Sequence, residues 1–415
     1  MVGTASKERS QGATRPESAP APFRIHVSDA ALVELRRRLE STRLAEAEAE
    51  AEVEPDHGEG WTLGMNPGYL RELLEYWRNA FDWRAQERSL NGFRQFTATV
   101  DGTRLHFLHE RGRGPAPLPL LLTHGFPDSF YRFHKLIPLL TDPAAHGADA
   151  SDAFDVIAPS LPGYGYSEPR RGHGGLFGFG GLLHALMRDV LGYERFGAHG
   201  GDWGSTITEQ MARSHAGSMV GIHLTDVPFW HALRKPKNAT AAEKKYLAQI
   251  EAFQKEKGAY AMIQATRPRT LEVGLTDSPA GLAAWIVEKF REWSDCGGGD
   301  DFDRCYTKDE LLTNVMIYWT TGTIGTSFQP YSDVMSAGAV RWMKEAAKNL
   351  VGSKSVPAGF AMFPKDLSSP PREWAERFFR VARWTEMPRG GHFAAMEQPE
   401  LLAEDIREFF RELRG

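Results

Sequence analysis

The 415-residue sequence lacks most of the features that mark specialised classes of protein. It has only two cysteines, Cys296 and Cys305, which excludes a framework of several disulfides or a cysteine-rich metal site, and we expect both to be free thiols. It has no run of about 18 apolar residues, so a membrane-spanning helix is not expected. Lysine and arginine total 49 against 54 for aspartate and glutamate, and this near balance lacks the basic excess of nucleic-acid-binding domains.

The N-terminus also lacks the apolar segment of a secretory signal. Residues 1–22 are instead rich in serine, proline, glycine and charge, and we predict a disordered tail. With free thiols and no targeting segment, the expected location is cytoplasmic, without a membrane anchor. What the chain does contain is apolar material, since 41% of its residues are hydrophobic and 24 are phenylalanine. That amount suffices for a large core.

Residues 23–110 are predicted to form a small N-terminal domain that begins with helices. Ser28 can cap a helix whose leucines recur at helical spacing, and Asn66-Pro67 is a typical start for a second helix. Residues 96–109 are typical of a β-hairpin that turns at Asp101-Gly102. This region therefore leads from helices into a sheet.

Beyond residue 110, short apolar strands alternate with helices, which is typical of a doubly wound, mostly parallel α/β sheet. Strands are expected at residues 117–123, 154–160, 195–200, 221–225, 356–363 and 381–385. Helical, aromatic-rich residues 227–355 interrupt this alternation and are predicted to form a lid. The core would then have two parts, residues 111–226 and 356–415. No internal repeat is apparent.

Two low-complexity segments carry no prediction of chemistry. Residues 45–54 alternate alanine and glutamate and are surface material, either helical or flexible. Residues 296–303 contain Gly-Gly-Gly-Asp-Asp, which we interpret as a mobile lid loop rather than a cation site. No metal and no organic cofactor is expected.

The strongest local motif is Gly-Gly-Asp-Trp-Gly at residues 200–204, where a strand is expected to pass into a helix. It has the form of a nucleophile elbow, a strained turn that exposes its central side chain. The central residue is Asp202, whose carboxylate is ionised at neutral pH and can attack a saturated carbon without a base. The resulting alkyl ester needs a base only to activate water. His124–Pro127 ends an earlier strand, and the N–H groups of Phe126 and Trp203 would then hold the oxyanion.

The base is expected after the last strand in this fold, and His392 is the only histidine beyond residue 231. Asp366 follows the preceding strand and is the candidate acid that orients it. Asp226, after the 221–225 strand, is the alternative acid. A phenol in the lid could protonate an oxygen that becomes an alkoxide. Spacing alone does not choose among the five lid tyrosines, Tyr246, Tyr260, Tyr306, Tyr318 and Tyr331.

A series of ordered motifs runs along nearly the whole chain from about Phe23. These motifs are Tyr76–Asn79, Phe81–Trp83, His124–Pro127, Gly201–Ser205, Ile263–Pro268, Asp277–Leu282 and Gly390–Ala394. In this series the chain resembles the microsomal-type epoxide hydrolases. The resemblance implies an α/β-hydrolase fold with that family's N-terminal domain, cis-stilbene-oxide hydrolase activity, and roles in detoxification and aromatic hydrocarbon catabolism.

The resemblance also implies site residues. Tyr260 stands three residues before an Ile-Gln pair, as the family's first lid tyrosine does. Tyr331 follows Thr-Gly-Thr-Ile at 321–324 and matches the second, although Gln329-Pro330 replaces the more usual Arg-Phe before it. The acid maps to Asp366. The anchor helix of membrane-bound relatives has no counterpart, so membrane attachment is not carried over.

The predicted function is hydrolysis of a small-molecule epoxide to a vicinal diol. Asp202 would attack a ring carbon while Tyr260 and Tyr331 protonate the oxygen, and His392 with Asp366 would activate water against the ester. No nucleic-acid partner is expected, and a homo-oligomer is left open. The alternative is a haloalkane or haloacid dehalogenase with the same nucleophile. A serine-type esterase and a non-catalytic binding protein are weaker alternatives.

Overall fold

The computed structural model describes residues 19–44, 59–170, 175–233, 235–296, 302–336 and 354–414. Four of the segments interpreted above lie wholly or partly outside this range. They are residues 1–18 of the expected tail, the alanine-glutamate segment 45–54, residues 297–301 of the lid loop and residues 337–353 of the lid.

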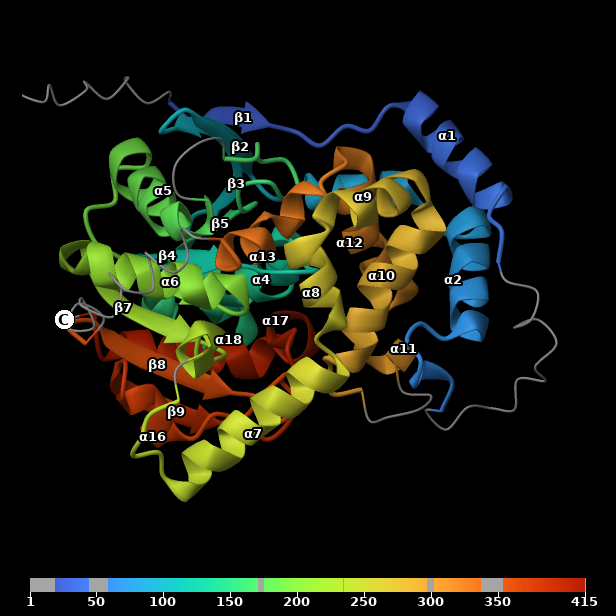
Figure 1. Ribbon diagram of the computed structural model, residues 1–415. Coiled ribbons are helices and arrows are strands. Elements are labelled where there is room, and N and C mark those ends of the chain that lie inside the picture. The colour runs from blue at the N-terminus through green and yellow to red at the C-terminus, as the bar shows by residue number, and fades with distance from the viewer. Residues whose placement is uncertain are drawn as a thin grey trace, which may run out of the picture.

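A nine-stranded sheet runs through the described residues, in the order β1-β2-β3-β5-β4-β6-β7-β8-β9 (Figure 1). Its strands are β1 Ala21–Phe23, β2 Gln95–Val100, β3 Thr103–Glu110, β4 Leu118–Thr123, β5 Phe154–Pro159, β6 Phe196–Gly200, β7 Met219–Leu224, β8 Pro357–Met362 and β9 Arg380–Glu386. Pairing is antiparallel from β1 to β5 and parallel from β5 to β9. The predicted α/β class with a mostly parallel sheet is confirmed.

The end of the expected N-terminal tail is ordered. Ala21–Phe23 pairs with β2, so the prediction of disorder is wrong for residues 21 and 22. The hairpin between β2 and β3 turns at Asp101 and Gly102, which have φ of 45° and 74°. Both lie in the left-handed region that two-residue hairpin turns require. The hairpin is confirmed, and it belongs to the main sheet.

Helices cover both faces of the sheet. These helices are α4 Leu136–Thr141, α5 Phe179–Ala185, α6 Trp203–Ser214, α16 Arg372–Glu376, α17 Ala394–Glu397 and α18 Pro399–Arg411. α6 packs on β4, β6 and β7, and α5 packs on α6, whereas α18 packs with α4. On α18, Phe409 and Phe410 lie against strand glycines so closely that a Cβ on Gly197 would come within 2.5 Å of the Phe410 ring. Small residues on these strands therefore bring α18 directly onto the sheet.

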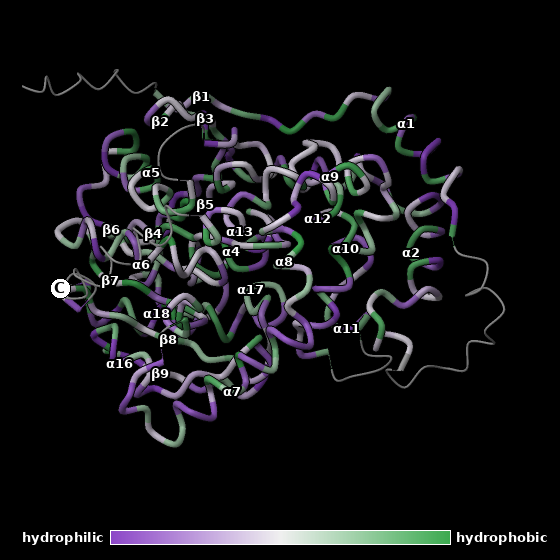
Figure 2. Tube along the Cα trace, in the orientation of Figure 1, coloured by the Kyte–Doolittle hydropathy of each residue, from purple (hydrophilic) through white to green (hydrophobic). Residues whose placement is uncertain are grey.

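The helices of the N-terminal region pack on the lid rather than on the sheet. They are α1 Asp29–Glu40, α2 Pro67–Asn79 and α3 Trp83–Leu90, and Ser28, Asn66 and Asp82 cap them through side-chain oxygens. Figure 1 shows α2 beside α10. α1 contacts α10, and α2 contacts both α10 and α12. Along α2 the residues alternate between hydrophobic and hydrophilic, as its one-sided packing requires (Figure 2). The region predicted as one domain thus contacts two parts of the molecule.

Most of the lid's described residues are helical. Its helices are α7 Ala241–Glu256, α8 Ala259–Thr266, α9 Pro268–Asp277, α10 Pro279–Glu292, α11 Phe302–Cys305, α12 Lys308–Thr321 and α13 Gln329–Val334. They lie between β7 and β8 in the sequence, as predicted for an insertion into the sheet. No helix in the described part of the chain is both long and apolar enough to cross a bilayer.

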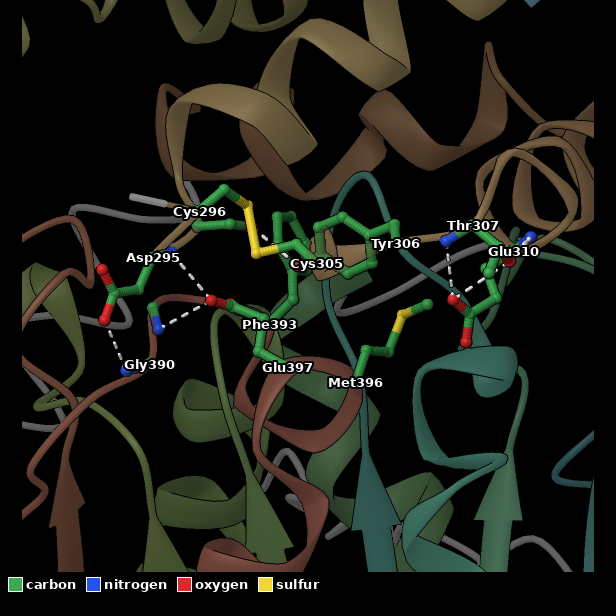
Figure 3. The surroundings of a disulfide bond; sticks show 12 residues. Asp295, Cys296, Cys305, Tyr306, Thr307, Glu310, Gly390, Phe393, Met396 and Glu397 are labelled. Atoms are coloured by element: carbon green, nitrogen blue, oxygen red, sulfur yellow. Dashed lines mark hydrogen bonds between the residues drawn. A yellow bond between two sulfur atoms is a disulfide. The ribbon is translucent and has the colours of Figure 1, made fainter. Parts of the chain in front are cut away.

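The two cysteines form a disulfide in the lid, so the expectation of free thiols is wrong. Cys296 and Cys305 are bonded, with their Cα atoms 5.6 Å apart (Figure 3). The bond closes a loop with a sequence separation of nine. Two isolated cysteines carry no sequence signal for pairing. Cys296 lies after the end of α10, and Cys305 is the last residue of α11. The thiols therefore no longer support the expected cytoplasmic location.

Candidate active site

Asp202 stands at the turn between β6 and α6. Its backbone has φ 58° and ψ −128°, a left-handed conformation that is strained for a residue with a side chain. The helix begins at the next residue, and its first turn approaches β4 so closely that a Cβ on Gly204 would lie 2.0 Å from the Thr123 carbonyl oxygen. The nucleophile-elbow geometry predicted from the motif is present.

One oxygen of the Asp202 carboxylate faces the loop after β4. The Phe126 N–H donates to Asp202 Oδ1 at 3.0 Å. The carboxylate fits against this loop only because Gly125 has no side chain, since a Cβ there would come within 2.1 Å of Oδ1. The N–H of Trp203, the second predicted donor, makes no hydrogen bond to this carboxylate in the described structure. Its oxyanion role stays a prediction.

His392 lies between two carboxylates. Its Nδ1 is 2.7 Å from Asp366 Oδ1, and its Nε2 is 3.5 Å from Asp202 Oδ2. The imidazole side chain is 2% exposed, so it titrates in a nearly dry environment. Burial by itself lowers the pKa of His392, but the charges and hydrogen bonds of the two carboxylates outweigh burial and raise it to about 10. Around neutral pH the ring is therefore an imidazolium.

A buried ion pair holds the two loops of the site together, and sequence reasoning missed it. Arg132, on the short 3₁₀ helix Phe130–Phe133, pairs with Asp128, and their side chains are 2% and 1% exposed. Asp128 accepts the N–H of Gly125 at 2.9 Å, and Arg132 donates to the His392 carbonyl oxygen. The pair thus joins the loop after β4 to the loop that carries His392. Its four-residue spacing is the only signal in the sequence.

Asp226, the alternative acid, lies on the other side of the nucleophile. Its Oδ2 accepts the backbone N–H of Asp202 at 2.8 Å, whereas His392 Nδ1 meets Asp366. Burial and the nearby charge of Asp366 raise the pKa of Asp226 to about 7. Asp226 therefore supports the elbow through its backbone, and Asp366 is the carboxylate that contacts His392 Nδ1.

The two lid tyrosines implied by the resemblance lie over the nucleophile. Tyr331 packs edge-on against the Trp203 ring at 4.9 Å between centroids, and its ring centroid is 6.0 Å from that of Tyr260. The Phe126 ring contacts both phenols, at 5.6 Å from Tyr331 and 6.5 Å from Tyr260. Phenols from α8 and α13 are thus brought to one place above Asp202.

Both phenols stay protonated over any ordinary pH range. Burial raises the pKa of Tyr260 and of Tyr331, and the negative charge of Asp202 raises both further. The remaining lid tyrosines lie elsewhere. Tyr318 donates to the Asp128 carbonyl oxygen at 2.7 Å, and Tyr306 is 2.6 Å from the Ser294 hydroxyl. Two neutral phenols therefore lie close enough to Asp202 to feel its charge.

No group of three or more histidine, cysteine, aspartate or glutamate side chains in the described residues could hold a metal ion. The groups near the Asp202 carboxylate that can donate a hydrogen bond include one backbone N–H, one imidazole and two phenols. Such a set suits a displacement at carbon followed by hydrolysis of an ester.

An elbow between a central strand and a helix, with a His–Asp pair after the last two strands, defines an α/β hydrolase. Comparison with known proteins agrees. Residues 20–133 match the family described as epoxide hydrolase N terminus, and residues 119–304 match the alpha/beta hydrolase fold. A putative epoxide hydrolase from Stigmatella aurantiaca is 41% identical over 95% of this chain and 85% of its own length. The chain belongs to the epoxide hydrolase family.

Other relatives agree with this assignment. Epoxide hydrolase 1 of Sus scrofa is 36% identical over 96% of this chain and 90% of its own length. Among solved structures, the juvenile hormone epoxide hydrolase of the silkworm Bombyx mori superposes with a TM-score of 0.80 at 29% identity and covers 95% of both chains. The epoxide hydrolase of Aspergillus niger gives a TM-score of 0.79 at 28% identity, over 95% of this chain and 97% of its own.

Proposed function

We propose that this chain hydrolyses epoxides to vicinal diols in two steps, through an ester on Asp202. The observation that carries the proposal is that the two carboxylate oxygens of Asp202 face different groups. Oδ1 accepts the Phe126 N–H at 3.0 Å, and Oδ2 faces His392 Nε2 at 3.5 Å. One oxygen is thus held as a future oxyanion, while the other is free to form the ester beside the base.

In the first step, Oδ2 of Asp202 attacks a ring carbon of the epoxide, and the bond from that carbon to the epoxide oxygen breaks. The oxygen takes a proton from Tyr260 or Tyr331, so that a β-hydroxyalkyl ester forms and a phenolate is left to regain a proton from solvent. Both phenols are neutral donors before the attack, since burial and Asp202 raise the pKa of each. General-acid assistance of this kind contributes about 10²- to 10⁴-fold.

In the second step, water attacks the carbonyl carbon of the ester. Alkylation removes the charge of Asp202, which is one of the causes that raise the pKa of His392, so this pKa falls and the ring can lose its proton. The neutral imidazole then takes a proton from water while Asp366 orients and stabilises it. The tetrahedral oxyanion on Oδ1 stays with the Phe126 N–H. As the tetrahedral intermediate collapses, the imidazolium returns the proton to the ester oxygen, and the diol leaves with that oxygen. The oxygen from water stays on Asp202, whose new carboxyl group gives its proton to His392.

This atom balance gives a direct test. In a single turnover with enzyme in excess in ¹⁸O-water, we expect the label in the peptide that contains Asp202 and ordinary oxygen in the diol. Direct attack of water on the epoxide would put the label in the diol and leave Asp202 unlabelled. A panel of terminal, disubstituted and aromatic epoxides, cis-stilbene oxide among them, would then define the substrate class.

The dehalogenase alternative has one observation in its favour. The indole N–H of Trp203, next to the nucleophile, is buried and makes no hydrogen bond within the described structure. A single N–H donor there would suit a leaving halide. The two neutral phenols over Asp202 suit an oxygen leaving group better, because they can give it a proton. Halide release from a chloroalkane at a rate comparable with epoxide turnover would favour the alternative.

A further inference from the structure

The loop that carries His392 is held by a carboxylate that takes no part in the steps above. Glu397, the last residue of α17, accepts the backbone N–H groups of Gly391 and Phe393 at 2.9 Å each. These residues are the two chain neighbours of His392. Glu397 also accepts the N–H of Asp295 in the lid at 2.8 Å (Figure 3). One carboxylate therefore fastens both sides of the base and joins them to the lid.

Two further hydrogen bonds join the lid to the loop that carries His392, and in both the lid supplies the acceptor. The carbonyl oxygen of Trp293 accepts the His392 N–H at 2.8 Å, and the carboxylate of Asp295 accepts the Gly390 N–H at 2.9 Å. The two backbones approach so closely that a Cβ on Gly391 would lie 2.6 Å from the Trp293 carbonyl oxygen. The lid segment 293–296 and the loop thus form one continuous hydrogen-bonded contact.

This lid segment also contacts the rings of the reaction centre. The Trp293 ring is 5.4 Å from the His392 ring and 5.2 Å from the Tyr260 ring, centroid to centroid. The segment ends at Cys296, whose disulfide to Cys305 ties it to α11 (Figure 3). The position of the base is therefore set against the lid as well as against the sheet.

We propose that Glu397 is a positioning residue that clamps the His392 loop to the lid and fixes the imidazole for hydrolysis of the ester. The proposal rests on the two-step function given above. Attack on the epoxide depends on Asp202, which its own elbow holds, whereas cleavage of the ester depends on where the imidazole stands. Loss of the clamp therefore slows the second step more than the first, since small misplacements of a catalytic group cost much of its effect.

Only a carboxylate side chain of this length can accept hydrogen bonds from all three N–H groups. Three N–H donors converge on two oxygens, and a glutamine would present its own NH₂ to at least one of them. Glu397→Gln keeps the size of the side chain and removes this match. Glu400→Gln is the matched control, because Glu400 lies three residues further along the chain, at the exposed start of α18.

The experiment is a rapid-quench single turnover that follows the ester on the enzyme as it forms and decays. For Glu397→Gln we expect an alkylation rate close to that of the parent and a hydrolysis rate about 10- to 100-fold lower. Glu400→Gln should match the parent in both. An unchanged hydrolysis rate overturns the proposal, and so does an equal fall in both rates. If the parent forms no ester, the proposed function itself fails, which is a separate result.

A milder variant covers the case in which Glu397→Gln does not fold. Asp295→Ala removes the bond from Gly390 and leaves the Asp295 backbone N–H on Glu397. It should show the same preference for the second step with a smaller decrease. Equal effects on both steps, or none on hydrolysis, would contradict the clamp.

Discussion

The two halves of the site are held in place by different means. On the sheet side, Asp202, Asp366 and His392 are fixed by backbone N–H groups, close glycines and charge pairs at 2.7 to 3.5 Å. On the lid side, Tyr260 and Tyr331 are fixed mainly by ring packing at 4.9 to 6.5 Å between centroids. Hydrogen bonds restrict both distance and angle, whereas ring packing permits a wider range of separations and orientations.

The largest effect that separates the halves is expected on the sheet side, at the acid. Asp366→Asn removes the charge that orients and stabilises His392, and we expect kcat to fall about 10⁴-fold, as loss of a triad carboxylate does elsewhere. Asp226→Asn is the matched control, because it still presents an oxygen to the Asp202 N–H. Steady-state kinetics of both variants on one epoxide measures the difference. A larger loss in Asp226→Asn would assign the acid to Asp226 instead.

On the lid side we expect smaller and shared losses. Tyr260→Phe and Tyr331→Phe each leave one phenol able to donate, so each should slow alkylation less than the double variant. The double variant should lose about 10²- to 10⁴-fold, the range for general-acid assistance. Rapid-quench measurement of the alkylation step tests this. Loss of hydrolysis with unchanged alkylation would place these phenols outside the proposed step.

The disulfide should affect stability more than chemistry. Cys296→Ser with Cys305→Ser releases a short loop in the lid, and for a sequence separation of nine we expect about 2–3 kcal/mol of lost stability from chain entropy. Urea unfolding of the double variant measures this value. A loss of turnover with unchanged stability would instead show that the disulfide acts directly on the neighbouring His392 loop.

A further expected effect is a dependence of stability on pH. The folded state keeps a proton on His392 up to pH about 10, whereas the unfolded imidazole loses it near 6.5. The folded state therefore binds more protons between these values, and the free energy of unfolding should decrease as pH rises through this window, by at most about 1.4 kcal/mol per pH unit. His392→Gln should lack this part of the slope. Equal slopes in parent and variant would contradict the raised pKa.

How much the sequence could predict depends on whether a feature is local in the chain. The structure confirms the predicted helix caps and the predicted hairpin turn, because their backbone geometry depends on neighbouring residues. Ser28 and Asn66 cap helices that begin at the next residue, and the hairpin turns at Asp101-Gly102. Strand β6, which precedes Asp202, ends at Gly200, the first residue of the predicted motif.

Features that depend on distant contacts could not be predicted from spacing. The strand Ala21–Phe23 exists through its pairing with β2. The disulfide closes a short loop, but two isolated cysteines carry no sequence signal for pairing. Nothing in the spacing of the lid tyrosines selects Tyr260 and Tyr331, and only the family resemblance singled them out. The clamp of Glu397 on the His392 loop has no sequence signal either, since its donors are backbone groups.

The central claim is that Asp202 becomes covalently bound to the substrate. The most direct measurement is the intact mass of His392→Gln after mixing with an epoxide, followed by mapping of the modified peptide. The account predicts a mass increase equal to one substrate molecule, located on Asp202, because alkylation proceeds while hydrolysis has lost its base. An unmodified enzyme that still forms diol, or an adduct on another residue, would contradict it.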